Sequence, residues 1–196
     1  EPKIPLSPMQ EESLLSFVKS DKVYYKYYDE LIILLGTGLR ISEFCGLTDR
    51  DIDFENRTIN VDHQLQYSGK KSYRIETPKT DNGIRKIPMS DCVLEALQRV
   101  MQNKKSSDFT VDGYIGFLFL TRNGTPKMCS SYDAMFRRLV GKYNKSHEEA
   151  LPAVTTPHTL RHTFCTNMAN AGMNPKALQY LMGHANITMT LNYYAH

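Results

Sequence analysis

The fold class is decided by residues 51–89, which read DIDFENRTINVDHQLQYSGKKSYRIETPKTDNGIRKIPM. Four short runs in this stretch are bounded by turn-forming residues, as strands are: 51–54, 58–63, 72–77 and 84–89. The tripeptide Glu55-Asn56-Arg57 suits a hairpin between the first two runs, and Asp81-Asn82-Gly83 contains the Asn-Gly pair of a tight turn between the last two. We therefore expect two hairpins in one small antiparallel sheet.

Helical patterns dominate on both sides of this stretch. Ser7, followed by Pro8 and Gln10, is typical of a capped helix that runs to about Lys19. Apolar residues from Val93 onward recur at helical spacing. Further helices are expected over 22–36, 90–100, 130–144, 157–172, 175–183 and 186–194. The sequence thus predicts an α+β fold, a mostly helical domain with a small antiparallel β-sheet.

Length and composition restrict the class of protein. A chain of 196 residues without repeats or Gly/Ser linkers is expected to form a single domain over 1–196. The longest apolar runs, 31–35 and 114–120, are far shorter than the roughly 20 residues that cross a bilayer. The 4 cysteines form no Cys-x-x-Cys motif, so a disulfide scaffold is excluded and a reducing cytoplasm is expected.

The charge is distributed unevenly along the chain. The net charge is only +3, but it divides into −5 over residues 1–65 and +8 over residues 66–196. A basic surface of this kind favours a polyanion such as DNA, although a solvated basic face without a ligand would give the same pattern. The candidate DNA-binding residues are Lys70, Lys71, Arg74, Arg85, Lys86, Arg137 and Arg138.

The segment His158-Thr159-Leu160-Arg161-His162 opens a predicted helix. Because His158 and Arg161 are three residues apart, they share a helix face beside free backbone N–H groups, which suits a phosphate. His158 and His162 also have the spacing of a zinc site. Such a site needs a Glu after the first His, where Thr159 stands, and Arg161 would repel the metal. His162 is therefore interpreted as a structural residue on the buried side.

Other candidates are weaker when taken singly. Arg40 follows a Gly-rich turn in Thr37-Gly38-Leu39-Arg40-Ile41-Ser42-Glu43, where it could simply pair with Glu43. Lys79 stands beside the Asn-Gly turn and could be solvated, and His184 after Gly183 could cap a helix end. The tyrosines 193 and 194 could serve only packing.

In this order, the motifs resemble those of the tyrosine recombinases, also called the phage integrase family. The resemblance covers about residue 4 to the last residue. The amino-acid sequence of the final motifs is most similar to that of integrases from conjugative transposons and Gram-positive phages. It implies that the catalytic residues are Arg40, Lys79, His158, Arg161, His184 and Tyr194, with Glu43 supporting Arg40. Tyr193 lies nine residues after His184 and Tyr194 ten, and the ending Tyr194-Ala195-His196 favours Tyr194 because the family ends in Tyr-x-His.

The resemblance implies a site-specific recombinase that cuts and rejoins DNA through a 3′-phosphotyrosyl intermediate, for integration and excision of a mobile element. It implies no cofactor and no metal. The expected partners are double-stranded DNA at element ends and target, a homo-oligomer on DNA, and an accessory excision factor, in a bacterial cytoplasm. It also implies further DNA-binding domains before, and a tail after, this region in a longer protein. A type IB topoisomerase-like enzyme and a non-catalytic DNA-binding module are the alternatives.

Overall fold

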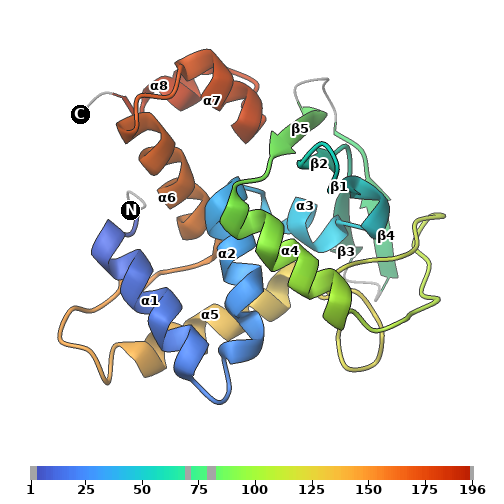
Figure 1. Ribbon diagram of the computed structural model, residues 1–196, viewed down its shortest axis with the longest axis horizontal. Coiled ribbons are helices and arrows are strands. Elements are labelled where there is room, and N and C mark those ends of the chain that lie inside the picture. Colours follow the sequence, from blue (N-terminus) through green and yellow to red (C-terminus); the bar gives the residue numbers. More distant parts are fainter. Residues whose placement is uncertain (1–3, 69–71, 79–82, 195–196) are drawn as a thin grey trace.

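The computed structural model describes residues 4–68, 72–78 and 83–194. Helices are the main secondary structure, and five short strands lie together at one side of the molecule (Figure 1). The helices are α1 (Pro8–Ser20), α2 (Tyr28–Thr37), α3 (Ile41–Gly46), α4 (Asp91–Asn103), α5 (Cys129–Tyr143), α6 (Pro157–Asn170), α7 (Pro175–Met182) and α8 (Ile187–Leu191), with 3₁₀ turns at Tyr25–Tyr27 and Asp49–Asp51. The strands are β1 (Ile52–Asp53), β2 (Thr58–Val61), β3 (Gln64–Ser68), β4 (Ser72–Glu76) and β5 (Arg85–Pro88). The predicted α+β class is confirmed.

Helix ends follow the capping signals of the sequence. Ser7 accepts a hydrogen bond from the backbone N–H of Gln10 at 3.1 Å, while the Gln10 side chain accepts one from the N–H of Ser7 at 3.0 Å. This reciprocal box opens α1 at the predicted residue. The helix expected over 22–36 begins later, at Tyr28, because the carboxylate of Asp21 accepts hydrogen bonds from Val23 and Tyr24 and holds the chain in a turn.

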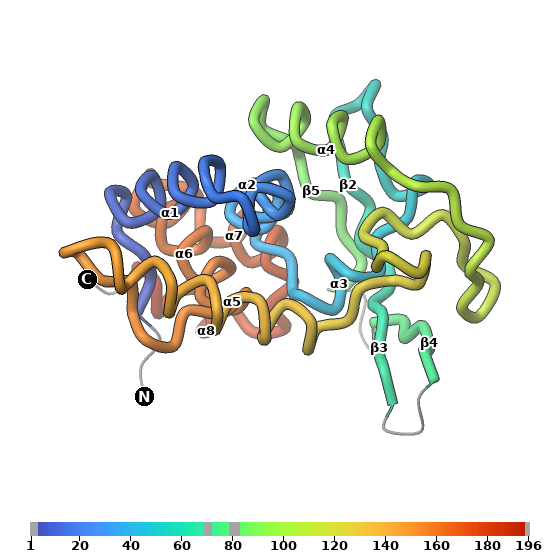
Figure 2. Tube along the Cα trace, turned by 90° about the horizontal axis from the view of Figure 1, so that it is seen from below, coloured from blue at the N-terminus to red at the C-terminus, as the bar shows by residue number. Residues whose placement is uncertain are grey.

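The first predicted hairpin is confirmed, since β1 pairs antiparallel with β2, but the predicted pairing of the last two strands is wrong. β4 pairs with β3, not with the strand after the Asn-Gly turn, and β5 pairs with β2. There are consequently two sheets in the described part of the chain, of order β1-β2-β5 and β3-β4. The β3–β4 hairpin extends away from the rest of the molecule in Figure 2.

Burial explains the pairing that the structure adopts. On β5, Arg85 and Ile87 are buried and alternate with exposed residues, and opposite them on β2 lie the buried Val61 and Ile59. Joining β5 to β2 therefore places four inward side chains on one face of the sheet. β3 was missed in the sequence because its alternation is weak: of its five residues only Leu65 is buried.

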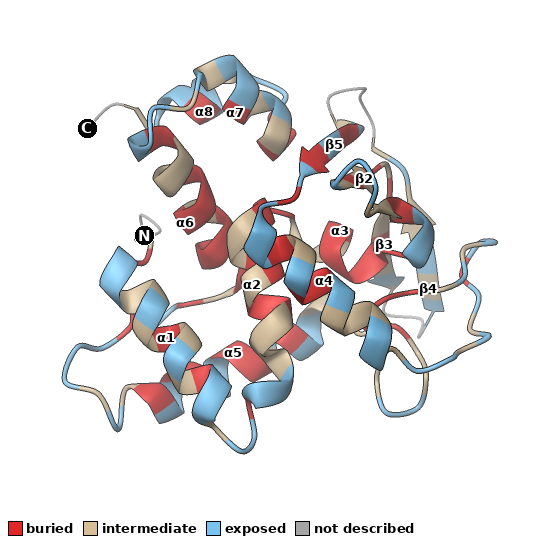
Figure 3. Ribbon diagram, viewed as in Figure 1, coloured by how far each residue is buried: buried red, intermediate tan, exposed pale blue. Residues whose placement is uncertain are grey.

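The core is organised around α2. Its residues Leu31, Ile33 and Leu34 are at most 1% exposed, and Figure 3 shows the buried faces of α2, α3 and α6 meeting at the centre. The α2 carboxylate of Glu30 accepts hydrogen bonds from Tyr132 Oη at 2.6 Å and Lys127 Nζ at 2.5 Å, which ties α5 to α2. A smaller apolar cluster joins α6, α7 and the residues after α8. No helix in the described ranges is long and apolar enough to span a membrane.

Candidate active site

Arg40 is positioned by the turn that ends α2. Gly38 has φ +64°, a left-handed conformation that favours glycine, and a Cβ there would lie 2.4 Å from the ring of Phe164. The chain therefore reverses tightly, and Arg40 stands directly before α3. Its guanidinium donates to Glu43 Oε1 at 2.8 Å and to the carbonyl of Gly183 at 3.0 Å, with 39% of the side chain exposed.

Glu43 is the buried anion of the site. Oε1 accepts from Arg40 Nη1 and, at 3.0 Å, from Arg85 Nη1, while Oε2 accepts from the Arg40 backbone N–H and from Arg85 Nη2, each at 2.8 Å. Burial alone would raise the pKa of Glu43, but hydrogen bonds and charge from Arg85 and then Arg40 lower it to about 2. The carboxylate is thus ionised whenever the protein is folded at neutral pH.

Arg161 joins two turns from inside the protein. It lies on α6, is 5% exposed, and donates Nη1 to the carbonyl of Gly38 and Nη2 to the carbonyl of Met182 at 2.5 Å. Burial, followed by the charge of Arg40, lowers the pKa of Arg161 to about 10. The guanidinium still carries its charge at pH 7, and it fixes the turn before Arg40 relative to the end of α7.

His184 follows the left-handed Gly183 that ends α7. The ring is 6% exposed, and Nδ1 lies 3.0 Å from Thr190 Oγ1 on α8. Burial lowers the pKa of His184 to about 4, with further lowering by Arg161 and Arg40. The ring is therefore neutral at physiological pH.

These groups form one electropositive site. The charges of Arg40, Arg85 and Arg161 all act on the carboxylate of Glu43, so these four groups together carry a positive charge that favours an anion. A cleft of about 430 Å³ opens beside Arg40 and Glu43. Its lining is completed by His63, Gln64, Pro78, Gly83, Gly183, Ala185 and Met189. The structure thus brings together Arg40, Glu43, Arg161 and His184 from widely separated parts of the sequence.

The two tyrosines point to different partners. Tyr193 Oη lies 2.9 Å from His162 Nδ1, and burial raises the pKa of Tyr193 while the charge of Arg161 partly opposes this. Tyr194 is half-buried and donates its hydroxyl proton to the carbonyl of Met173, in the turn between α6 and α7, at 2.5 Å. The Tyr194 hydroxyl therefore faces the α6–α7 turn rather than the arginines.

The remaining predicted residues are distributed as follows. His158 is exposed at the second position of α6, and His162 is half-buried. The side chains of Lys86, Arg137 and Arg138 are exposed, and Arg74 is exposed and paired with Glu76 on its own strand. Lys70, Lys71 and Lys79 lie outside the described residues.

Arg85 corrects the predicted DNA-binding surface. Its side chain is wholly buried and bound to Glu43, so it is not on a surface that a DNA backbone can reach. A basic residue in a charged run was expected to be solvated; the alternation of β5 places it inward, opposite Val61. That alternation, Arg85 with Ile87, was the sequence signal that could have identified it.

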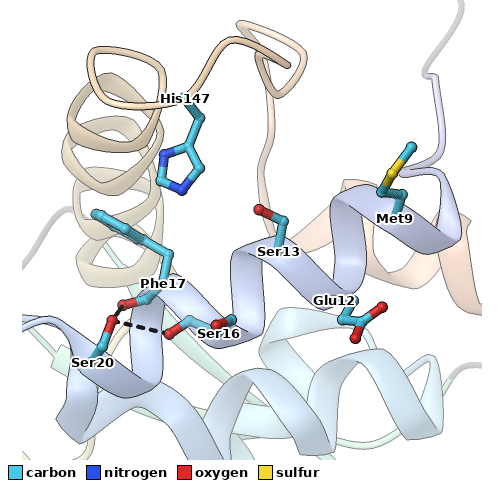
Figure 4. A pocket seen from close by; sticks show the side chains of 7 residues that line it. All are labelled: Met9, Glu12, Ser13, Ser16, Phe17, Ser20 and His147. Carbon is cyan, nitrogen blue, oxygen red and sulfur yellow. Dashed lines mark hydrogen bonds between the residues drawn. The ribbon is translucent and has the colours of Figure 1, made fainter.

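A hollow lies outside this site, and a group of possible cation ligands borders the site through His63, which also lines the cleft. A hollow of about 540 Å³ runs along α1 towards His147 (Figure 4), and none of the described candidate residues lines it. Asp51, Asp62 and His63 are close enough to hold a cation among the described residues. Both ring nitrogens of His63 already face oxygens, Asp62 Oδ1 at 2.6 Å and Gly46 O at 2.7 Å, which is the pattern of a hydrogen-bonding ring rather than of a metal ligand.

The low pKa of His184 predicts a dependence of stability on pH. The unfolded ring titrates near 6.5 and the folded ring near 4, so between these values the unfolded state binds more protons. The His184 contribution is fully present above pH 6.5 and is lost as the pH falls to 4. Denaturant unfolding of wild type and His184→Gln from pH 4 to pH 7 checks this: the wild-type decline should shrink in the variant, and equal slopes would contradict it.

Comparisons with known proteins agree with this geometry. A model of the phage integrase family matches residues 5–196. The transposase from transposon Tn916 of Enterococcus faecalis is 60% identical over 196 residues, which is 100% of this chain and 48% of that protein. The tyrosine recombinase XerA of Pyrococcus horikoshii is 29% identical over a match that covers 98% of this chain and 59% of the XerA sequence.

Solved structures give the same result. The Tn1549 transposon integrase in complex with a circular intermediate DNA superposes with a TM-score of 0.97 and 65% identity over 100% of this chain and 62% of that one. Structures of that integrase on DNA carry an Arg-to-Lys substitution in one case and a Tyr-to-Phe substitution in another. This chain spans about half the length of the curated relatives it matches, at 48% for the Tn916 transposase. By its family match, its similarity to these relatives and its shared fold, the chain belongs to the phage integrase family.

Proposed function

We propose that this chain is the catalytic domain of a site-specific tyrosine recombinase that integrates and excises a mobile element. The single observation that carries the proposal is the cluster of Arg40 and Arg161 around a fixed carboxylate beside an open cleft. Two guanidinium groups in a partly dry site suit the non-bridging oxygens of a phosphodiester, because each offers planar donors and a permanent charge. Further support is the 65% identity to an integrase that was solved on circular intermediate DNA.

In the proposed reaction, the Tyr194 oxygen attacks phosphorus, the bond from phosphorus to the 5′ oxygen breaks, and a 3′-phosphotyrosyl link remains. Arg40 and Arg161 stabilise the charge that develops on the non-bridging oxygens. His158 accepts the phenol proton, and Lys79 protonates the leaving 5′ oxygen. A 5′-hydroxyl of another strand then reverses these steps, so the bond energy is conserved.

His184 is proposed to donate a hydrogen bond to the phosphate. The ring is neutral near pH 7, so only one nitrogen carries a proton. When the Thr190 hydroxyl donates to Nδ1, that proton lies on Nε2, which is then free to donate.

The choice of Tyr194 over Tyr193 is supported by residue spacing. The Arg and Tyr positions substituted in the Tn1549 integrase variants are separated by the same number of residues as Arg40 and Tyr194, one more than separates Arg40 and Tyr193. Contacts in the free protein do not separate the two tyrosines, because Tyr193 contacts His162, Tyr194 contacts Met173, and both pack in the α6–α7 cluster. For attack, the Tyr194 hydroxyl must leave the Met173 carbonyl and turn towards the arginines.

We propose double-stranded element-end and target DNA as the substrate, a homo-oligomer as the assembly on DNA, an accessory excision factor as a further partner, and the bacterial cytoplasm as the location. The exposed Arg74, Lys86, Arg137 and Arg138, with Lys70 and Lys71, are proposed to contact the DNA backbone. No specific observation favours a type IB topoisomerase or a non-catalytic DNA-binding module.

The proposed chemistry needs no metal, because the arginines supply the positive charge. We expect cleavage of a nicked element-end duplex, followed as a protein–DNA adduct on a denaturing gel, to continue unchanged in excess EDTA. A metal-dependent nuclease used as the control must stop under the same conditions. Loss of the adduct on chelation, with recovery on adding Mg²⁺, would overturn metal independence.

A further inference from the structure

Arg85 is a charged side chain with no exposure to solvent. On β5 it donates Nη1 to Glu43 Oε1 at 3.0 Å and Nη2 to Glu43 Oε2 at 2.8 Å, a two-pronged contact that matches the planes of the two groups. Desolvating two ions is costly, so a buried pair is a weak source of stability compared with apolar residues of similar size. The geometry of the pair is therefore more informative than its contribution to folding.

The position of Arg85 is itself fixed at two further points. Nε donates to the carbonyl of Leu181 in α7 at 2.7 Å, and Nη1 donates to the carbonyl of Gly83, directly after residues 79–82, at 3.2 Å. A guanidinium held from three directions has little rotational freedom. The Glu43 carboxylate, which is hydrogen-bonded to this guanidinium, is therefore also restricted in rotation.

Glu43 transmits the restriction to Arg40. Each of its oxygens accepts one hydrogen bond from Arg85 and one from Arg40, through the Arg40 backbone N–H and guanidinium. Within the described part of the chain, the hydrogen bonds to Glu43 come from Arg85 and Arg40 alone, so without Arg85 it would keep only its two contacts with Arg40. The Arg40 side chain lines the cleft and is 39% exposed. A series of contacts therefore links Arg85 on β5, through Glu43, to the Arg40 guanidinium at the cleft.

We propose that Arg85 is a positioning residue that holds the Arg40 guanidinium, through Glu43, in the orientation that binds the scissile phosphate. This inference rests on the proposed function for its consequence in catalysis, but the orientation of Arg40 is a property of the free protein. Lowering of the pKa of Glu43 by Arg85 agrees with a tight contact between the two.

The orientation of Arg40 is measured first, without DNA. In ¹⁵N NMR of the arginine side chains, the wild-type Arg40 Nη signals should be separate because hydrogen bonds to Glu43 and Gly183 slow rotation about Cζ. In Arg85→Met we expect them to average. Arg99→Met is the matched control, since Arg99 also pairs with a carboxylate, Asp29 at 2.8 Å, but lies on α4. Separate Arg40 signals in folded Arg85→Met would overturn the proposal.

Cleavage of the nicked duplex is measured second. Arg85→Met should cleave about 100-fold more slowly, the effect of a small misplacement of a group that contacts the reacting phosphate. Its Kd for the duplex should change less than about threefold, and Arg99→Met should cleave at the wild-type rate. In a double-mutant cycle with Glu43→Gln, the combined loss should be close to the larger single loss. If the loss of cleavage rate in the double variant equals the product of the two single losses, Arg85 does not act through Glu43.

Folding and function are kept apart by two further variants. The double variant Glu43→Gln with Arg85→Met leaves no unpaired buried charge, and Arg85→Lys keeps a cation beside Glu43 but cannot form the fork. If Arg85→Met does not unfold cooperatively, Arg85→Lys carries the test and should show averaged Arg40 signals and at least about tenfold slower cleavage. If the Arg40 signals average in the Arg85 variants but the wild type forms no adduct, the recombinase proposal is wrong and the positioning role of Arg85 is retained.

Discussion

Tyr194→Phe is expected to lose all covalent attachment to DNA. The substitution removes only the hydroxyl, so the ring keeps its packing in the α6–α7 cluster and the protein should remain folded. Without the phenolic oxygen no phosphotyrosyl bond can form, although binding of the duplex should persist. The measurement is a denaturing gel of labelled, nicked element-end DNA incubated with the protein, read for a slower-migrating adduct.

Tyr193→Phe is the matched control. It removes a hydroxyl that contacts His162 at 2.9 Å, and the expected result is an adduct at a level within a fewfold of the wild type. The reverse outcome, an adduct with Tyr194→Phe and none with Tyr193→Phe, would assign the reaction to Tyr193. That outcome would agree with the effect of Arg161 in the free protein, where burial raises the pKa of Tyr193 and the charge of Arg161 lowers it in part.

Arg161→Lys is expected to slow cleavage by about 100- to 1,000-fold, the usual loss when one donor to a transition-state oxyanion is removed. A lysine keeps the charge but cannot donate to both the Gly38 and Met182 carbonyls and to a phosphate oxygen from one planar group. The free energy of unfolding should also fall by about 1 to 3 kcal/mol, because a buried carbonyl loses its donor. Single-turnover cleavage and urea unfolding measure the two effects.

The control for this variant is Arg99→Lys, which changes a half-exposed arginine of α4 and should leave cleavage unchanged. A wild-type cleavage rate in Arg161→Lys, with a lower stability, would mean that Arg161 only joins the two turns. In that case Arg40 would be the only arginine assigned to the phosphate.

Much of the fold followed from local signals in the sequence. The Ser7 box, the prolines at 157 and 175, and the glycine at 183 mark helix ends that the structure contains. Arg40, Glu43, Arg161 and His184 were all named as site residues, and the structure brings them together. Local chemistry sufficed here because caps and left-handed turns are determined by a few neighbouring residues.

Long-range pairing could not be predicted in the same way. The Asn-Gly turn suggested that β4 pairs with β5, yet burial of Ile87 and Arg85 opposite Ile59 and Val61 joins β5 to β2. The burial of Arg85 depends on Glu43, 42 residues earlier, and on a carbonyl of α7, 96 residues later. The alternation with Ile87 indicates that Arg85 points inward, but no local pattern identifies the distant partners that satisfy its charge.

In the proposed reaction, a tyrosine of this chain forms a covalent bond to a DNA 3′-phosphate. The most direct measurement is to trap the adduct on a nicked element-end duplex, digest the protein and the DNA, and identify the modified peptide by mass spectrometry. We expect one modification, on Tyr194, in which the label on the DNA strand 5′ to the break stays with the protein and a free 5′-hydroxyl is released. A 5′-phosphate link, a modified residue other than tyrosine, or cleaved DNA without any adduct would contradict it.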